Sequence, residues 1–200
     1  PDALSTDCRS AVRTADIGGT TLVFFDRADP GDPRIRSVSR PGRLTLAPSG
    51  RPVIQFHSDL LSLADRPIMT TEAKLESTDP LVRVFPRHGT DFCLSVNVRS
   101  LGASAAGVLC RTNITGSDNL IVWLDFERGL IQLRRGVKGR LLAEANHPLM
   151  ERSNCRLMLW AEGPFLDIYL NDAWVLSGCT EARISGGFGV AVRGGEARFD

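Results

Sequence analysis

The feature that most constrains the fold is a train of short alternating segments between residues 91 and 200. Apolar and polar residues alternate within each segment, and Gly, Asn, Asp or Ser stands between one segment and the next. The segments are DFCLSVNVRS, GVLCRTN, NLIVWLDF, LIQLRRG, RLLAEA, RLMLWAEG, FLDIYLND, WVLSG, GFGVAVRG and EARFD. Short, regularly spaced strands of this kind are typical of antiparallel sandwiches and barrels. The sequence therefore predicts an all-β, antiparallel two-sheet sandwich.

The size of the chain favours one domain. Two hundred residues, of which 42% are apolar, can bury a full sandwich core. Residues 1–19 show no clear period and are predicted to be an N-terminal arm or linker. Residues 20–200 are predicted to form a single β-sandwich domain.

The charge balance excludes several classes of partner. Lys and Arg together number 24 and Asp and Glu 23, so there is no electrostatic reason to expect nucleic acid or an anionic membrane surface as a partner. The sequence also lacks the run of about eighteen apolar residues that a membrane span requires. We expect neither a nucleic-acid nor a membrane partner.

The two ends of the sequence suggest a fragment. Pro1-Asp2-Ala3 lacks the basic and apolar regions of a signal peptide. The final residues, 196–200, alternate like a strand and then stop, where an intact domain would usually add a tail. We expect the chain to be a piece of a longer protein.

The cysteines leave the redox compartment open. There are five of them, with no CxxC pair of the kind that binds zinc, and all but the first lie in or beside predicted strands: Cys8, Cys93, Cys110, Cys155 and Cys179. They are either buried free thiols or one or two disulfides of a secreted protein. The pattern Asn113-Ile114-Thr115 is an N-glycosylation acceptor. These two features favour a secreted or extracellular location.

The first half of the chain continues the strand rhythm. Strands are predicted over residues 20–25, 37–47 (as two short strands about Pro41-Gly42), 51–58, 68–77 and 81–85. Residues 59–65 could close one helical turn or end a strand.

The segment 119–126 holds the residues that we select as a candidate site. Its apolar alternates are predicted to point into the core, whereas Asn119, Ile121, Trp123 and Asp125 share a face that is both polar and aromatic. Gln132 and Arg134 are expected beside this face on the following strand, and Arg111 on the preceding one.

The order of the segments carries a resemblance. AGVLCR, DNLIVWLDFERGLIQLRR, LDIYLNDAWVLSG and GGFGVAVRGGEARFD resemble the concanavalin-like (laminin G-like) jelly-roll sandwiches of carbohydrate-active proteins. These include the C-terminal sandwich of family 32 glycoside hydrolases, similar sandwiches of family 43 enzymes, and the 3-keto-disaccharide hydrolase domain. The resemblance covers residues 91–200 well and 20–90 only in rhythm. Its most specific piece is the ending, with a turn at Asn171-Asp172 and a Gly-rich turn at Gly186-Gly187.

The resemblance implies a jelly-roll sandwich and an oligo- or polysaccharide partner. Sugar binding needs an aromatic platform and polar groups for the hydroxyls. The residues that could supply them are Arg111, Trp123, Asp125, Gln132, Arg134 and Trp174. Trp160 is expected in the core.

No catalytic motif stands in the sequence. A GxSxG elbow is absent, and His57, His88 and His147 lack metal-site spacing. Segment 26–30 (DRADP) only echoes the RDP triplet of family 32 enzymes, because Ala separates Arg from Asp. No catalytic residue and no cofactor are predicted, although a structural calcium ion near Asp118-Asn119 is an alternative.

Three functions remain open from the sequence. The first is a non-catalytic sandwich module of a glycoside hydrolase, which braces a catalytic domain in the same parent chain and contacts carbohydrate. The second is a lectin-like carbohydrate-binding or adhesion module. The third is an enzyme of the 3-keto-disaccharide hydrolase type. Neither the sugar, its linkage nor the oligomeric state follows from the sequence.

Overall fold

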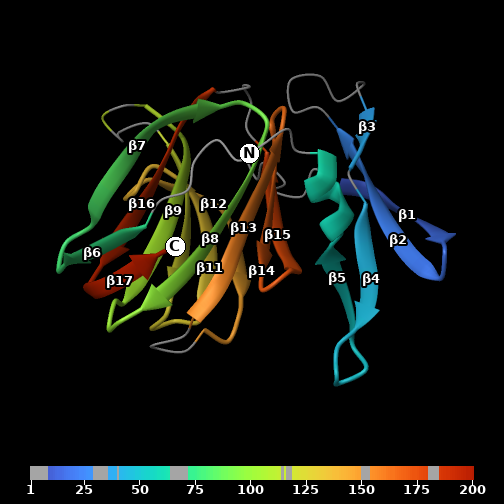
Figure 1. Cartoon of the computed structure of the whole chain (residues 1–200), viewed down its shortest axis with the longest axis horizontal. Coiled ribbons are helices and arrows are strands. Elements are labelled where there is room, and N and C mark those ends of the chain that lie inside the picture. Colours follow the sequence, from blue (N-terminus) through green and yellow to red (C-terminus); the bar gives the residue numbers. More distant parts are fainter. Residues whose placement is uncertain are drawn as a thin grey trace, which may run out of the picture.

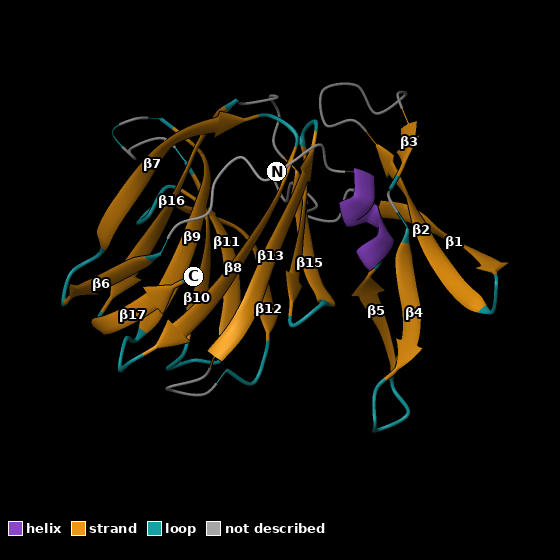
Figure 2. Cartoon of the chain, in the orientation of Figure 1, coloured by secondary structure: helices purple, strands orange, loops and turns teal. Residues whose placement is uncertain are grey.

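The computed structural model describes residues 9–28, 36–39, 41–63, 72–113, 115, 119–149, 154–179 and 185–200. Most of these residues lie in antiparallel strands that form two facing sheets, as Figures 1 and 2 show. The predicted all-β two-sheet sandwich is therefore confirmed. Within the described ranges, no helix is long and apolar enough to cross a membrane.

In the described part of the chain the larger sheet has eleven strands and the smaller sheet six. The larger sheet runs in the order β1 (Arg9–Ile17), β2 (Thr20–Ala28), β4 (Gly42–Leu46), β5 (Pro52–Phe56), β15 (Ala173–Cys179), β14 (Phe165–Leu170), β13 (Asn154–Glu162), β8 (Phe92–Ser100), β17 (Gly195–Phe199) and β6 (Ala73–Ser77), with β3 (Arg36–Val38) paired to β2. The smaller sheet runs in the order β12 (Arg140–Asn146), β11 (Leu130–Arg135), β10 (Leu120–Asp125), β9 (Ala105–Thr112), β16 (Gly186–Arg193) and β7 (Leu81–Gly89). Of the predicted strand over 68–77, residues 68–71 lie outside the described residues.

The main core lies between the two sheets and follows the predicted alternation. From the smaller sheet, Leu120, Val122 and Leu124 enter the core, and each is 2% exposed or less. Ile168 and Leu170 meet them from the larger sheet. Each side chain of this size contributes about 1.5–3 kcal/mol when it leaves water. The inward face predicted for the segment 119–126 is confirmed.

The turn between β14 and β15 is the predicted tight hairpin. Asn171 and Asp172 have φ angles of 49° and 67°. Two consecutive residues in the left-handed region define the hairpin turn that matches the twist of the strands, and Asn and Asp tolerate that region better than most residues. The pair Asn171-Asp172 in the sequence was therefore sufficient to predict this turn.

The N-terminal lobe consists of β1 to β5 and the 3₁₀ helix η1 (Ser58–Leu63). Strand β1 lies within the predicted arm and pairs with β2 along most of its length. Gly18 and Gly19, with φ angles of 58° and 77°, form the hairpin turn between them. The Gly-Gly pair is a hairpin-turn signal and so indicated a strand on either side of it, although the weak alternation of the arm did not indicate a strand. The helical alternative for residues 59–65 takes the form of η1.

The lobe is attached to the larger sheet by a narrow joint. Strand β5 pairs with β15 at Gln55 and Ala173. An aromatic cluster, which we call the joint cluster, then packs the lobe onto the outer face of β13 and β14; it consists of Phe56, Met158, Trp160 and Tyr169. Trp160 is buried as expected, but in this joint and not in the central core. Figure 1 shows the lobe standing beside the sandwich and curling away from it.

The cysteines divide into two kinds. Cys93, Cys110 and Cys155 are free thiols, and burial raises their pKa values to about 11, 12 and 11. Cys179 is disulfide-bonded. Cys8 lies outside the described residues. Buried free thiols and a disulfide are therefore both present in this chain.

Candidate functional site

The face predicted around Trp123 lies on the outer side of the smaller sheet, where other side chains cover it. Trp123 is 4% exposed and packs with Leu109, Ile121 and Ala191. Its Nε1 donates a hydrogen bond to the Val137 carbonyl at 3.3 Å. The guanidinium of Arg193 lies 5.8 Å from the ring centroid. The ring is therefore not an open platform for a sugar.

The polar neighbours of Trp123 bond to one another or to nearby turns. Asp125 is 3% exposed, and its Oδ1 accepts a hydrogen bond from the Arg128 backbone at 3.0 Å, which fixes the β10–β11 turn. Gln132 donates to the Glu144 carboxylate, and Arg134 donates to Gln132 Oε1 at 3.1 Å. Arg134 also donates to the Gly139 carbonyl at 3.0 Å. Gln132, Arg134 and Glu144 thus form a network across β11 and β12, whereas Asp125 bonds to the β10–β11 turn.

The other two predicted residues lie apart from this network. Arg111 is the penultimate residue of β9, has a φ of 53° and is 2% exposed. Its guanidinium donates to the Gly163 carbonyl in the turn between β13 and β14. It thereby links the two sheets. Trp174 lies on β15, half-buried, with its ring 6.1 Å from that of Phe25 and its Nε1 donating to Ser177 at 3.1 Å. The six predicted residues do not form a single open site.

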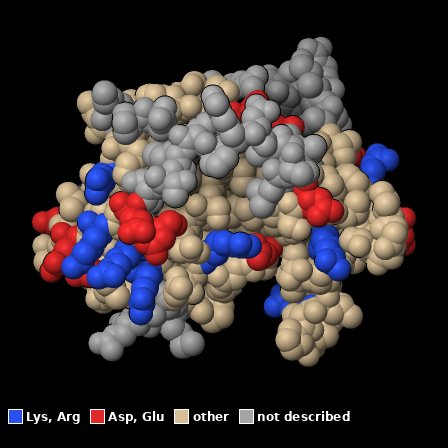
Figure 3. Space-filling view, viewed as in Figure 1, with Lys and Arg blue, Asp and Glu red and all other residues tan. Residues whose placement is uncertain are grey.

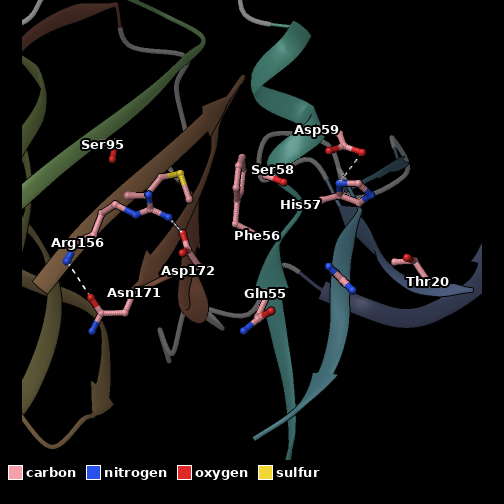
Figure 4. Close-up of a pocket in the computed structure, with 12 residues that line it drawn as sticks. Thr20, Gln55, Phe56, His57, Ser58, Asp59, Ser95, Arg156, Asn171 and Asp172 are labelled. Atoms are coloured by element: carbon pink, nitrogen blue, oxygen red, sulfur yellow. Dashed lines mark hydrogen bonds and ion pairs between the residues drawn. The ribbon is translucent and has the colours of Figure 1, made fainter.

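A cleft that the sequence did not indicate lies between the lobe and the outer face of the larger sheet. It has a volume of about 420 Å³ and opens beside the joint cluster. Its lining comes from β2, β4, β5, η1, β8, β13 and the β14–β15 turn: Thr20, Arg43, Gln55, Phe56, His57, Ser58, Asp59, Ser95, Arg156, Met158, Asn171 and Asp172. Figure 4 shows these side chains facing one another from the lobe and the sandwich.

The sandwich wall of the cleft is built around Arg156. The backbone N–H of Arg156 donates to Asn171 Oδ1 at 2.9 Å, and its guanidinium pairs with the Asp172 carboxylate. Figure 4 shows both contacts. The left-handed turn at 171–172 is what aims these two side chains back at β13. The turn therefore fixes one rim of the cleft.

The lobe wall carries polar side chains from neighbouring strands. Arg43 on β4 stands opposite Gln55 on β5 in the antiparallel register. Beyond them His57 Nδ1 lies 3.9 Å from Asp59 Oδ2 at the start of η1. Phe56 and Met158 add apolar surface to the lining. The cleft thus combines an apolar patch with amide, guanidinium, hydroxyl and carboxylate groups.

Such a composition can bind a polar ring, because both apolar and hydrogen-bonding groups line the cleft. A ligand site is typically a pocket of about 300–1,000 Å³ in which a few polar groups orient the ligand. Asp172 is held in an ion pair, and Asp59 is 84% exposed. Within the described ranges, no group of three or more His, Cys, Asp or Glu residues could hold a metal ion. Asp118 of the calcium alternative and residues 29–30 of the segment 26–30 lie outside the described residues.

Comparisons with known proteins agree with the fold. No protein-family model matches the sequence, and no curated protein matches it either. Among solved structures, the carbohydrate-binding module CBM66 from Bacillus subtilis is 18% identical with a TM-score of 0.58, and the match covers 80% of this chain and 88% of that one. Sucrose-6-phosphate hydrolase from Lactobacillus gasseri is 14% identical with a TM-score of 0.66, and exo-inulinase from Aspergillus awamori is 15% identical with a TM-score of 0.65.

The matches to the two enzymes cover 96% of this chain but only 40% and 42% of theirs. The chain therefore corresponds to less than half of each enzyme but to most of the binding module. At these identities the likeness shows a shared β-sandwich fold. The predicted resemblance to sandwiches of carbohydrate-active proteins is thus supported at the level of structure.

Proposed function

We propose that this chain is a non-catalytic β-sandwich module of a glycoside hydrolase that contacts carbohydrate in the cleft between the N-terminal lobe and the larger sheet. The observation that carries the proposal is the cleft itself, where Gln55, Arg156 and Asn171 surround apolar surface from Phe56 and Met158. Sugars offer both hydroxyl groups and an apolar ring face, and such a lining can bind both.

Bracing of a catalytic domain is the second part of the proposal. The fold recurs in two enzymes named as hydrolases, of which this chain matches about two fifths. A second candidate, a carbohydrate-binding module that acts without a catalytic neighbour, is favoured by the match to 88% of the CBM66 chain. Both candidates use the same cleft, and they differ in whether a catalytic domain shares the parent chain.

A secreted or extracellular location fits this function. The disulfide at Cys179 is of a kind that persists in oxidising compartments. Polysaccharide substrates are also met outside the cell. We place the module there as part of the proposal.

Isothermal titration of the purified chain with inulin, levan, arabinan, xylan and simple disaccharides tests the proposal, with product analysis on the same samples. We expect binding without product. Arg156→Gln should weaken the binding about tenfold, because hydrogen bonds to charged groups contribute about 1.5–3 kcal/mol. The exposed Arg156–Asp172 pair adds only about 0–1 kcal/mol to stability, so the variant should stay folded.

Arg134→Gln is the matched control, since it makes the same change on the face predicted from the sequence. It should leave the affinity unchanged. If Arg134→Gln weakened binding and Arg156→Gln did not, the site would lie on the smaller sheet, and the cleft would be the wrong assignment. Release of product by the isolated chain would contradict the non-catalytic role.

A further inference from the structure

We propose that the cleft selects sugars that carry an anionic substituent, and that Arg43 is the residue that binds the anion. This inference rests on the proposed function, because it concerns the same cleft. It assigns to one side chain the choice between acidic and neutral sugars, because the shape of the cleft alone does not distinguish them.

Arg43 occupies the middle of the polar lobe wall. In the antiparallel register it stands opposite Gln55 on β5 and opposite Leu22 on β2. Thr20 lies two residues before Leu22 and therefore on the same face of β2. Three polar side chains from three adjacent strands thus line the cleft together.

The other charges of the cleft already have partners. Arg156 is paired with Asp172, and Asp59 lies beside His57. Arg43 has no ion pair with any residue that the structure describes. Arg43 is therefore the arginine in the lining whose charge is not balanced by a described carboxylate. A guanidinium presents a planar fork of N–H donors, which matches the oxygens of a carboxylate or phosphate better than a single hydroxyl.

The net charge of the chain gives anions little long-range attraction. The net charge is +1, and Figure 3 shows basic and acidic side chains interleaved over β6 and β17. For example, Lys74 Nζ lies 2.9 Å from Glu196 Oε2. We therefore assign a preference for acidic sugars to short-range contact with Arg43 inside the cleft. Such a contact is partly screened by salt, because the Debye length is about 10 Å at 0.1 M ionic strength.

A sugar can carry the anion as a ring carboxylate, as in a uronic acid, or as a phosphate ester. Both offer several anionic oxygens on one small group, and the geometry of Arg43 suits either. The test therefore uses two pairs of ligands, each with a neutral member: glucuronate with glucose, and fructose 6-phosphate with fructose.

Titration of the wild-type chain with the four ligands should show that the acidic member of at least one pair binds about tenfold more tightly than its neutral partner, as expected for a charge-assisted hydrogen bond. The pair that shows the difference identifies the anion. Arg43→Gln should lower the affinity for the acidic sugar to that for its neutral partner, both measured on the same variant. Raising the salt concentration to 0.5 M should reduce the difference in the wild type.

Arg51→Gln is the matched control, because Arg51 is an exposed arginine at the start of β5 that does not line the cleft. It should preserve the preference for the acidic member. Equal affinities within both pairs, or a preference that survives Arg43→Gln, would overturn the inference while leaving the proposed function in place. If no sugar bound, neutral or acidic, both the inference and the proposed function would fail.

Discussion

Replacing Phe56 by alanine should detach the N-terminal lobe from the sandwich. Phe56 is 8% exposed, and its ring centroid lies 5.5 Å from that of Trp160 and 5.4 Å from that of Tyr169. Truncation of a buried Phe to Ala costs about 3–5 kcal/mol. The two ring pairs account for about 0.5–1.5 kcal/mol each within that cost.

Among the described residues the lobe has few other attachments. Strand β5 meets β15 at one register pair, the Phe56 N–H donates to the Asp172 carbonyl at 2.7 Å, and the Phe25 ring lies 6.1 Å from that of Trp174. Loss of the ring should therefore act first on the lobe. In a chain of this size about 1 kcal/mol corresponds to about 2–4 °C in Tm, so we expect Tm to fall by about 10 °C. Alternatively the lobe unfolds in a separate, earlier transition.

Thermal unfolding followed by circular dichroism, together with amide hydrogen exchange of β1 to β5, measures both effects. Phe56→Leu should recover most of the loss, because it keeps much of the apolar volume and removes only the ring contacts. Leu46→Ala, at a lobe position that is 72% exposed, is the control and should change stability by less than about 0.5 kcal/mol. An unchanged Tm and unchanged exchange in Phe56→Ala would refute the view that the joint cluster holds the lobe.

Three further predictions follow from particular residues. Cys110 should resist alkylation at pH 8 in the native chain, because burial raises its pKa to about 12, and it should react once urea is added. Cys179 should react only after its disulfide is reduced. Peptide mass spectrometry measures the alkylation of both cysteines. Burial lowers the pKa of His147. As the pH drops below about 6.5, the unfolded chain binds a proton at His147 before the folded chain does, so the free energy of unfolding should fall. Urea unfolding at pH 7.5 and 5.5 should show a smaller fall in this free energy for His147→Gln than for the wild type. Gly186→Ala should destabilise the chain by about 1–3 kcal/mol, because the new Cβ would lie 2.4 Å from the Arg111 carbonyl carbon, and a backbone atom cannot move away as a side chain can. A urea midpoint equal to that of Ser185→Ala would contradict this prediction.

Much of the sandwich could be predicted from the sequence because alternation is a local signal. The inward faces of 120–126 and 165–170 and the turn at Asn171-Asp172 depend on residues that are neighbours in the chain. Strand β1 was missed because its alternation is weak, although Gly18-Gly19 marked its turn. The local pattern was thus sufficient to predict those features that depend on a single strand and its adjoining turn.

The candidate site could not be predicted in the same way. Alternation placed Trp123 on the outer face of its sheet, but it does not show what covers that face. The covering comes from Val137 and Arg193, which approach from a turn and from a strand far along the chain. The cleft likewise joins Gln55 to Arg156, about half the chain apart, through the packing of the lobe on the larger sheet. Such long-range contacts leave no period in the sequence.

The most direct test of the carbohydrate site is a chemical-shift map of the ¹⁵N-labelled chain, titrated with the tightest-binding sugar of the panel. The account predicts that the perturbed amides cluster at Gln55, Met158 and Asn171, with the indole N–H of Trp123 unchanged. Perturbations centred on Trp123 and its neighbours on β10 and β11, or none at millimolar sugar, would contradict the assignment of the cleft.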